Sequence, residues 1–206
     1  TGADGKCCTP ARVRGEEITF IKLMADMGSK GAAVLALGQC GSYGGIPAAK
    51  PNPAECMGVT EFFKLYKINT PVINIPGCPP HPDWIVGTIA HVLLFGVPEL
   101  DSDGRPKIFY STLVHDNCPY RSYYDEQKFA KFFGDEGCRL ELGCKGPESY
   151  SDCWKRGWNN HVNWCVHNSL CLGCTELGHP TEMSPDDGPL RRKGSNCLWD
   201  GSRGSN

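Results

Sequence analysis

The stretch from His115 to Cys174 most constrains how this chain can fold, because it is crowded with soft metal ligands. In chain order the candidate ligands are His115, Cys118, Cys138, Cys144, Cys153, Cys165, Cys171 and Cys174. They form two consecutive sets of four, and four thiolate or imidazole donors are what a tetrahedral zinc ion or a cubane iron–sulfur cluster takes from a protein. The sequence therefore predicts a module that depends on bound metal as well as on its own core.

The spacing of these ligands favours iron–sulfur over zinc. The first set reads His-x2-Cys…Cys-x5-Cys and the second reads Cys-x11-Cys-x5-Cys-x2-Cys. Zinc sites generally combine two Cys-x2-Cys knuckles, or one knuckle with a short His pair, and this stretch has one knuckle, at residues 171–174. The longer spacings suit loops that wrap a larger cluster. Zinc and metal-free thiols stay open as alternatives at this point.

The composition and charge of the chain exclude some classes of binding partner. The 206 residues carry a net charge of -2 with acidic and basic side chains interspersed, which is not the basic surface that nucleic-acid binding requires. No apolar run approaches the roughly 18 residues that span a bilayer, so we expect no transmembrane segment in this chain. The 13 cysteines are compatible with a disulfide framework, but such frameworks usually occur in chains too small to bury a core. We therefore expect metal thiolates and no nucleic-acid partner.

The first hundred residues alternate helix-like and strand-like patterns. Apolar residues recur at helical spacing in residues 16–27, 59–68 and 82–95, and short apolar runs at residues 32–37 and 71–75 are typical of buried strands. Such alternation predicts an α/β fold, with a parallel sheet covered by helices on both faces. Cys40 and Cys78 each follow one predicted strand. Because the carboxyl ends of parallel strands meet at one edge, we expect both thiols on that edge, in rigid loops.

The pattern changes after about Gly104. Helical signals become short, at residues 125–133 and 149–155, and Gly, Cys, Asn and Trp dominate. We therefore place a boundary near residues 97–107 and divide the chain into residues 1–104, a metal-binding domain at 105–184 and a polar tail at 185–206. No catalytic motif is present, so the predicted role is electron transfer. The remaining histidines and cysteines are interpreted as hydrogen-bonding, surface or spare residues: His81, His91, His161, His167, His179, Cys7, Cys8, Cys56 and Cys197.

Five segments carry a more specific likeness. They are CGSYGGIPAAKPNP at residues 40–53, VINIPGCPPHPDW at 72–84, HDNC at 115–118, GCKGP at 143–147 and WNNHVNW at 158–164. In this order they resemble the small subunit of nickel-iron hydrogenases, and the resemblance runs from about Gly5 to Pro180. It implies a flavodoxin-like domain with a proximal 4Fe-4S cluster, followed by a small irregular domain with a medial and a distal cluster.

The resemblance also assigns ligands residue by residue. Cys40 and Cys78 correspond to two of the four proximal ligands. The distal 4Fe-4S set is His115, Cys118, Cys138 and Cys144, and the medial set includes Cys153, Cys171 and Cys174. The family's other proximal pair is a Cys-x2-Cys near the N-terminus, which nothing before Gly5 supplies. We therefore expect that the chain lacks its first several dozen residues, which would leave the proximal cluster incompletely ligated.

The residue at position 165 differs between this chain and many members of the family. Those members have Pro at this position and carry a medial 3Fe-4S cluster, so a thiolate here predicts a medial 4Fe-4S cluster, as in the nickel-iron-selenium subgroup. Any selenium would lie in the large subunit. The alternative is a buried thiol beside a 3Fe-4S cluster. Oxygen-tolerant members add two proximal cysteines, one of them at the position of Gly45, so this chain resembles the standard proximal type.

The resemblance implies a function as well. The chain would relay electrons between a nickel-iron centre in a separate large subunit, where H2 is activated, and a cytochrome or ferredoxin, in the periplasm. Two alternatives are a structural zinc-binding protein without a redox role and a subunit of another respiratory complex that shares the proximal motif. The long Cys-rich second half argues against the last of these.

Overall fold

The computed structural model describes residues 9–158, 165 and 169–180. Several residues singled out above lie outside the described part: Cys7, Cys8, His161, Trp164, His167, Cys197 and the tail at residues 185–206.

A parallel pair of strands forms the centre of the first half of the chain. Strand β3 (Val34–Leu37) pairs with β4 (Val72–Ile75) in the register Val34↔Val72 to Leu37↔Ile75. Helix α3 (Val59–Leu65) lies between them in the sequence, and helix α4 (Pro82–Phe95) follows β4. Apart from Asn74, both strands consist of apolar residues, and Ala36, Ile73 and Ile75 are buried. The predicted α/β alternation is confirmed, and α4 has the predicted bounds.

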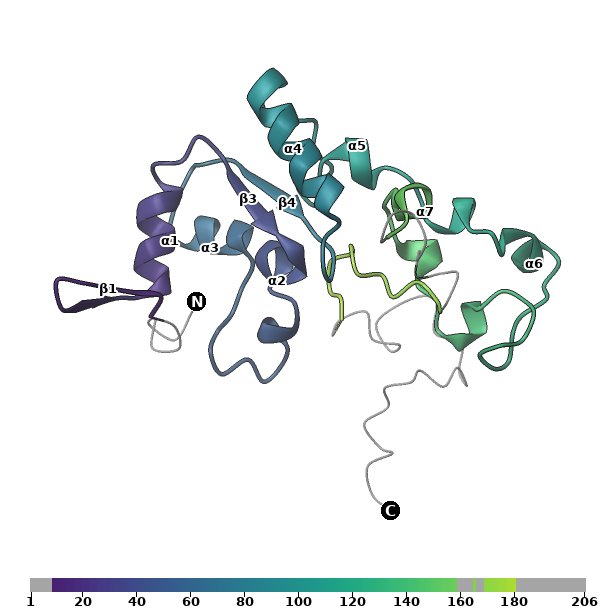
Figure 1. Ribbon diagram of the computed structural model, residues 1–206. Helices are drawn as coiled ribbons and strands as arrows, with labels where there is room; N and C mark the ends of the chain where they lie inside the picture. The colour runs from purple at the N-terminus through teal and green to yellow at the C-terminus, as the bar shows by residue number, and fades with distance from the viewer. Residues whose placement is uncertain (1–8, 159–164, 166–168, 181–206) are drawn as a thin grey trace, which may run out of the picture.

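Helices lie on both sides of the strand pair. Ile73 and Ile75 pack in one core cluster with Trp84 of α4, whereas the Thr60 hydroxyl of α3 lies 3.4 Å from Asn74 Oδ1. Because successive side chains of a strand point to opposite faces, α4 and α3 cover opposite faces of β4. Figure 1 shows the same arrangement, with α1 (Phe20–Gly28) and α3 on one side and α4 on the other.

The first predicted helix begins later than its apolar pattern indicates. Residues Glu16–Ile18 form strand β2, which pairs antiparallel with β1 (Ala11–Val13). Thr19 is the N-cap of α1, and its side chain accepts a hydrogen bond from the Lys22 backbone. A threonine cap satisfies amides at the first turn, so the helix starts there and the prediction for residues 16–19 was wrong.

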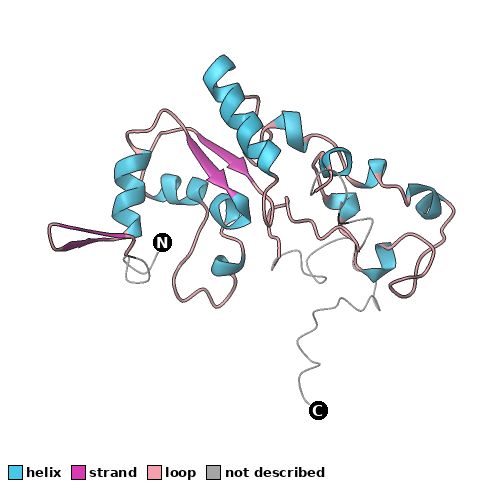
Figure 2. Cartoon of the chain, viewed as in Figure 1, coloured by secondary structure: helices cyan, strands magenta, loops and turns pink. Residues whose placement is uncertain are grey.

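The second half of the chain is built mainly from loops and single helical turns (Figure 2). Its short elements are α5 (Lys107–Tyr110), η3 (His115–Asn117), α6 (Arg121–Asp125), η4 (Leu140–Leu142), η5 (Gly146–Glu148) and α7 (Cys153–Arg156), where η marks a 3-10 helix. The predicted helix at 125–133 was wrong, because α6 ends at Asp125, Gln127 has a positive φ of 56°, and Phe129 bridges to Cys138. The helix predicted at 149–155 shrinks to α7, because Ser149 and Ser151 form backbone hydrogen bonds to Val114 and Thr112.

One hydrophobic core crosses the predicted boundary between the two halves. Its buried members are Ile73, Ile75, Trp84, Phe109, Tyr110, Val114, Cys153 and Cys171. Trp84 is fully buried, its ring centroid lies 5.0 Å from that of Tyr110, and its indole N–H donates to Asp152 Oδ1 at 2.7 Å. Two candidate metal ligands are therefore part of the same core as the parallel strands.

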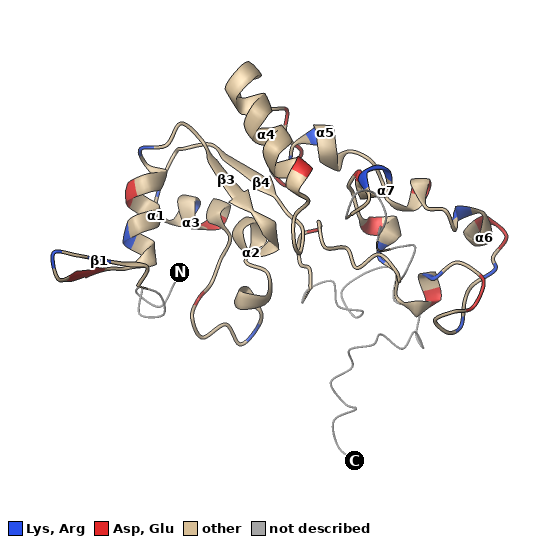
Figure 3. Ribbon diagram, viewed as in Figure 1, with Lys and Arg blue, Asp and Glu red and all other residues tan. Residues whose placement is uncertain are grey.

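Charged side chains of both signs are distributed over the described ribbon, as Figure 3 shows. Among the described helices, none has both the length and the apolar character needed to cross a membrane.

Candidate metal centres

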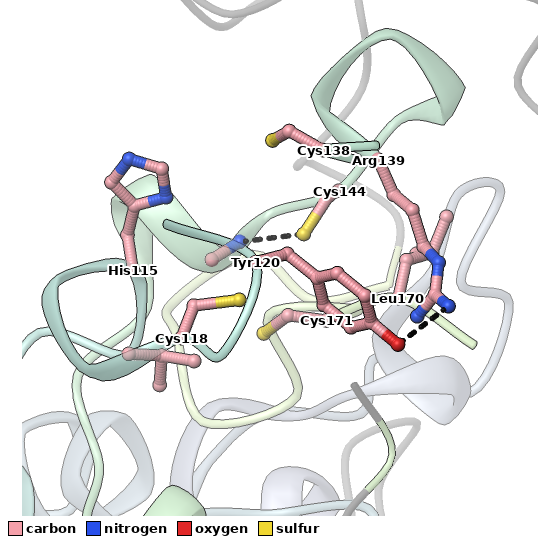
Figure 4. Close-up of a pocket in the computed structure, with 10 residues that line it drawn as sticks. His115, Cys118, Tyr120, Cys138, Arg139, Cys144, Leu170 and Cys171 are labelled. Atoms are coloured by element: carbon pink, nitrogen blue, oxygen red, sulfur yellow. Dashed lines mark hydrogen bonds between the residues drawn. The ribbon is translucent and has the colours of Figure 1, made fainter. Parts of the chain in front are cut away.

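Four of the predicted ligands surround one cavity in the second half of the chain. His115 and Cys118 approach it from η3 and its end, Cys138 from the loop after Gly137, and Cys144 from the turn after η4. Figure 4 shows these side chains around a shared space, together with Cys171, Tyr120, Arg139 and Leu170. The structure thus brings the whole predicted distal set together.

Local backbone geometry holds each of these donors in place. The Cys118 amide donates to the His115 carbonyl at 3.2 Å, which closes the η3 turn between the two ligands. Cys138 exchanges hydrogen bonds with its opposing segment, donating to Lys128 and accepting from Ala130, both at 2.9 Å. Gly143 has a left-handed φ of 98°, a conformation that glycine adopts without a steric penalty, and it ends η4 directly before Cys144.

Burial changes the pKa values of these four side chains. Loss of solvent raises the pKa of Cys118 to about 11 and also raises the pKa values of Cys138 and Cys144, so these groups are neutral thiols at pH 7 unless a metal replaces the proton. Burial lowers the pKa of His115, which keeps its imidazole neutral and its nitrogen available for a metal. The donor set is chemically suited to an iron–sulfur cluster.

Arg139 is a feature of this cavity that spacing did not reveal. Its guanidinium carbon lies 4.4 Å from the centroid of the Tyr120 ring, and it donates to the Tyr120 hydroxyl at 3.2 Å and to the Ser169 carbonyl. Its charge opposes the burial effect by lowering the pKa values of Cys118, Cys138 and Cys144. A basic residue directly after a ligand cysteine is the only sequence signal for it.

Two of the predicted medial ligands belong to the hydrophobic core. Cys153 and Cys171 are buried, and each has a serine partner: the Ser151 hydroxyl donates to Cys153 Sγ at 3.1 Å, and Cys171 Sγ lies 3.4 Å from Ser149 Oγ. Burial raises the pKa of Cys171 well above its usual value, and charge on Cys144 and Cys165 raises it further. Cys165 itself is exposed. Serine hydroxyls that reach ligand sulfurs are a further feature the ligand spacing did not predict.

Two contacts connect the predicted sets. Cys171, which is predicted for the medial set, also borders the cavity of the predicted distal set, and its carbonyl accepts the Lys145 amide at 2.8 Å, one residue after Cys144. Cys174 lies next to the proximal residues: burial raises its pKa to about 11, and a hydrogen bond from the Cys78 backbone partly offsets this effect. The three predicted sets are therefore neighbours in the order proximal, medial, distal.

Cys40 and Cys78 lie where the two parallel strands end. Cys40 is in helix α2 (Gly38–Tyr43), so the expectation of a loop was wrong, whereas Cys78 follows β4 in an irregular turn. The Gln39 amide donates to the Gly77 carbonyl at 2.9 Å, which joins the two segments. Both thiols are exposed at the same edge, as the strand pattern predicted. A side chain at Gly45 would place its Cβ 3.0 Å from Cys40 Sγ, so the glycine leaves that sulfur uncrowded.

The donors are spread more widely than a single ion requires. Within the described residues, no three His, Cys, Asp or Glu side chains converge closely enough to hold one metal ion. A cubane cluster takes one ligand on each of its irons, so its ligands stand apart around a larger object.

Both halves of the chain are similar to known proteins. Residues 110–186 match the family model for the C-terminal region of the NiFe/NiFeSe hydrogenase small subunit, and residues 5–92 match that of the NADH ubiquinone oxidoreductase 20 Kd subunit. A solved structure of the Desulfomicrobium baculatum NiFeSe hydrogenase superposes with a TM-score of 0.84 at 46% identity, covering 90% of this chain and 71% of that chain. The chain belongs to the family of NiFe and NiFeSe hydrogenase small subunits. A recombinant NiFeSe hydrogenase from Desulfovibrio vulgaris Hildenborough gives the same TM-score and identity over 89% of this chain and 69% of that one.

Curated members of the family are longer than this chain. The periplasmic NiFeSe hydrogenase small subunit of Desulfomicrobium baculatum is 46% identical over 90% of this chain, which spans 62% of that protein. The periplasmic NiFe hydrogenase small subunit of Solidesulfovibrio fructosivorans is 44% identical over 76% of this chain, which spans 50% of it. The family model that matches residues 110–186 covers the Cys-rich second half of the chain. The family assignment therefore applies to that half as well.

Proposed function

We propose that this member of the hydrogenase small-subunit family transfers electrons through three iron–sulfur sites for the reaction H2 ⇌ 2H+ + 2e-. The observation that carries the proposal is the convergence of His115, Cys118, Cys138 and Cys144 on one cavity, with further thiols leading from it toward Cys40 and Cys78. Iron–sulfur clusters, when bound, accept and release single electrons. The two halves would be a flavodoxin-like domain at residues 1–104 and a cluster-binding domain at 105–184, before a polar tail at 185–206.

The residues of this chain would hold the sites as follows. Cys40 and Cys78 supply part of the proximal 4Fe-4S set, and His115, Cys118, Cys138 and Cys144 hold the distal one. Cys153, Cys165, Cys171 and Cys174 hold a medial 4Fe-4S cluster. The Ser151 hydroxyl donates a hydrogen bond to Cys153 Sγ, which stabilises added negative charge on that sulfur and so favours the reduced state.

Partners and location follow from the relatives. Their names describe hydrogenase small subunits, several of them periplasmic. We accordingly assign this chain a large subunit with a nickel-iron or nickel-iron-selenium centre, a periplasmic location, and a cytochrome or ferredoxin as its external electron carrier. The exposed edge at Cys40 and Cys78 is the side from which the relay would begin.

Metal analysis of the purified heterodimer tests the proposal. We expect about four iron and four acid-labile sulfide for each complete cubane site, with brown colour and an EPR signal after reduction. One zinc per four-ligand site, with no visible absorption, would instead support a structural zinc protein. The result that contradicts electron transfer is a fully folded chain that contains no iron.

Cys165→Pro tests the medial assignment. The variant removes the fourth thiolate, so the medial cluster should lose one iron, become 3Fe-4S and show a higher reduction potential. Cys56→Ser is the matched control, because Cys56 belongs to none of the predicted ligand sets, and it should leave iron content unchanged. Unchanged iron content and EPR spectra in Cys165→Pro would remove Cys165 from the ligand set.

A further inference from the structure

Gln39 joins three segments that carry predicted ligands. It precedes Cys40, and its backbone amide donates to the carbonyl of Gly77, the residue before Cys78, at 2.9 Å. Its side chain is 2% exposed, and Nε2 donates to the carbonyl of Glu176 at 2.8 Å and to that of His179 at 3.2 Å. The two proximal segments are thus tied to the chain that leaves Cys174.

The side chain of Glu176 connects the same segment to Arg105 and to Tyr150. One carboxylate oxygen accepts from Arg105 Nη1 at 2.9 Å, and the other accepts from the Tyr150 amide at 2.6 Å. Arg105 also donates to the Thr175 carbonyl at 3.1 Å. The Arg105 Nε forms a salt bridge with Asp101 Oδ2 at 2.7 Å. A single buried carboxylate therefore links residues before position 107 to the segment that precedes Cys153.

This set of contacts lies beside the point where two predicted sites come close, at Cys78 and Cys174. The Cys78 backbone lies close enough to the Cys174 thiol to lower its pKa, so a predicted proximal ligand and a predicted medial ligand are neighbours. Arg105 and Thr175 are 5% and 2% exposed, so water does not compete for these hydrogen bonds. Both side chains of the salt bridge are mostly shielded from solvent, with exposures of 6% for Arg105 and 12% for Glu176.

We propose that Glu176 is a positioning residue that, with Gln39 and Arg105, fixes the separation of the Cys40–Cys78 edge from Cys174 and so governs electron exchange between the proximal and medial sites. This inference rests on the proposed function. In the step concerned, one electron leaves the proximal site and reduces the medial site, and no bond or proton is exchanged. Glu176 touches no reacting atom and acts through the placement of Cys174.

The test compares Glu176→Ala and Glu176→Gln with the wild-type heterodimer. Iron content and the EPR signals of all three sites establish first that the clusters are present; a wild-type heterodimer that lacks the proximal or the medial cluster would overturn the proposed function rather than this inference. The readout is magnetic coupling between the reduced proximal and medial clusters, seen as splitting of their EPR signals. Isotope exchange between H2 and D2O, which needs no relay through this chain, reports separately on the large subunit. Glu99→Gln is the matched control, since Glu99 forms an exposed ion pair with Lys107.

We expect Glu176→Ala to lose the splitting and to slow dye reduction while isotope exchange stays at the wild-type level. Glu176→Gln, which keeps an acceptor for the Tyr150 amide, should lose less, and Glu99→Gln should lose nothing. Unchanged splitting in Glu176→Ala would overturn the inference. Loss of the medial cluster in both Glu176 variants, with the distal cluster retained, would overturn it too, because Glu176 would then serve cluster assembly rather than spacing.

Discussion

Replacing Arg105 with Met should destabilise the chain substantially at neutral pH. Arg105 is 5% exposed, and carboxylate oxygens of Asp101, Asp103 and Glu176 surround it at 2.7, 3.4 and 2.9 Å. Removing the cation leaves two mostly buried carboxylates without their counter-charge, and breaking a buried pair in this way costs about 3–5 kcal/mol. Asp101 retains backbone donors from residues 103 and 105, so we take the lower end, about 3 kcal/mol.

The cost should depend on pH. Burial already raises the pKa of Glu176, and Arg105 opposes that shift, so the variant should raise the pKa of Glu176 further. A carboxyl whose pKa is raised by folding binds protons more readily in the folded state, and its protonation stabilises the fold as pH falls through the raised pKa. The penalty of Arg105→Met should therefore be largest at pH 7 and smaller at pH 5.

Urea unfolding of the iron-loaded chain, followed by tryptophan fluorescence at pH 7 and pH 5, measures this penalty. In thermal unfolding, about 3 kcal/mol corresponds to a decrease in Tm of about 6–12 °C for a chain of this size. Lys107→Met is the control, because Lys107 pairs with Glu99 at an exposed site and should cost less than about 1 kcal/mol. A penalty for Arg105→Met no greater than that of the control, or one that does not change between the two pH values, would refute the reasoning.

Three further predictions use other parts of the structure. Trp84→Phe removes the bond to Asp152 and leaves a cavity in the shared core, so urea unfolding should show a loss of about 2–3 kcal/mol; a loss under about 1 kcal/mol would contradict the packing. Gly58→Ala would place Cβ against the Ser42 carbonyl oxygen, closer than van der Waals contact allows, and the same measurement should show a loss of about 1–3 kcal/mol, whereas a neutral result would contradict this close approach. Removing iron with a chelator should abolish hydrogen-exchange protection in residues 105–180 and leave that of β3 and β4, and equal loss in both halves would contradict a metal-dependent second half.

Short-range patterns predicted the first half well. The bounds of α4, the pairing of β3 with β4 and the common edge of Cys40 and Cys78 follow from periodicity and from the rule that parallel strands end together. Two predictions from these patterns were wrong. Helix α1 begins after its N-cap Thr19 rather than at residue 16, and Cys40 lies in helix α2 rather than in a loop. In the second half, backbone pairing of distant segments replaced the helix expected at residues 125–133.

By itself, the sequence determined which residues are soft donors and which family the chain belongs to, because both depend on residue type and spacing along the chain. The tertiary structure alone decided which donors meet. It placed Cys171 against the distal cavity, Cys174 against Cys78, and Glu176 between Arg105 and Tyr150. These contacts join segments that are distant in the sequence, and they form because burying Trp84, Tyr110 and their neighbours in one core brings both halves together. The spacing of ligands says nothing about such contacts, since a hydrophobic core is specified by the whole fold rather than by any one segment.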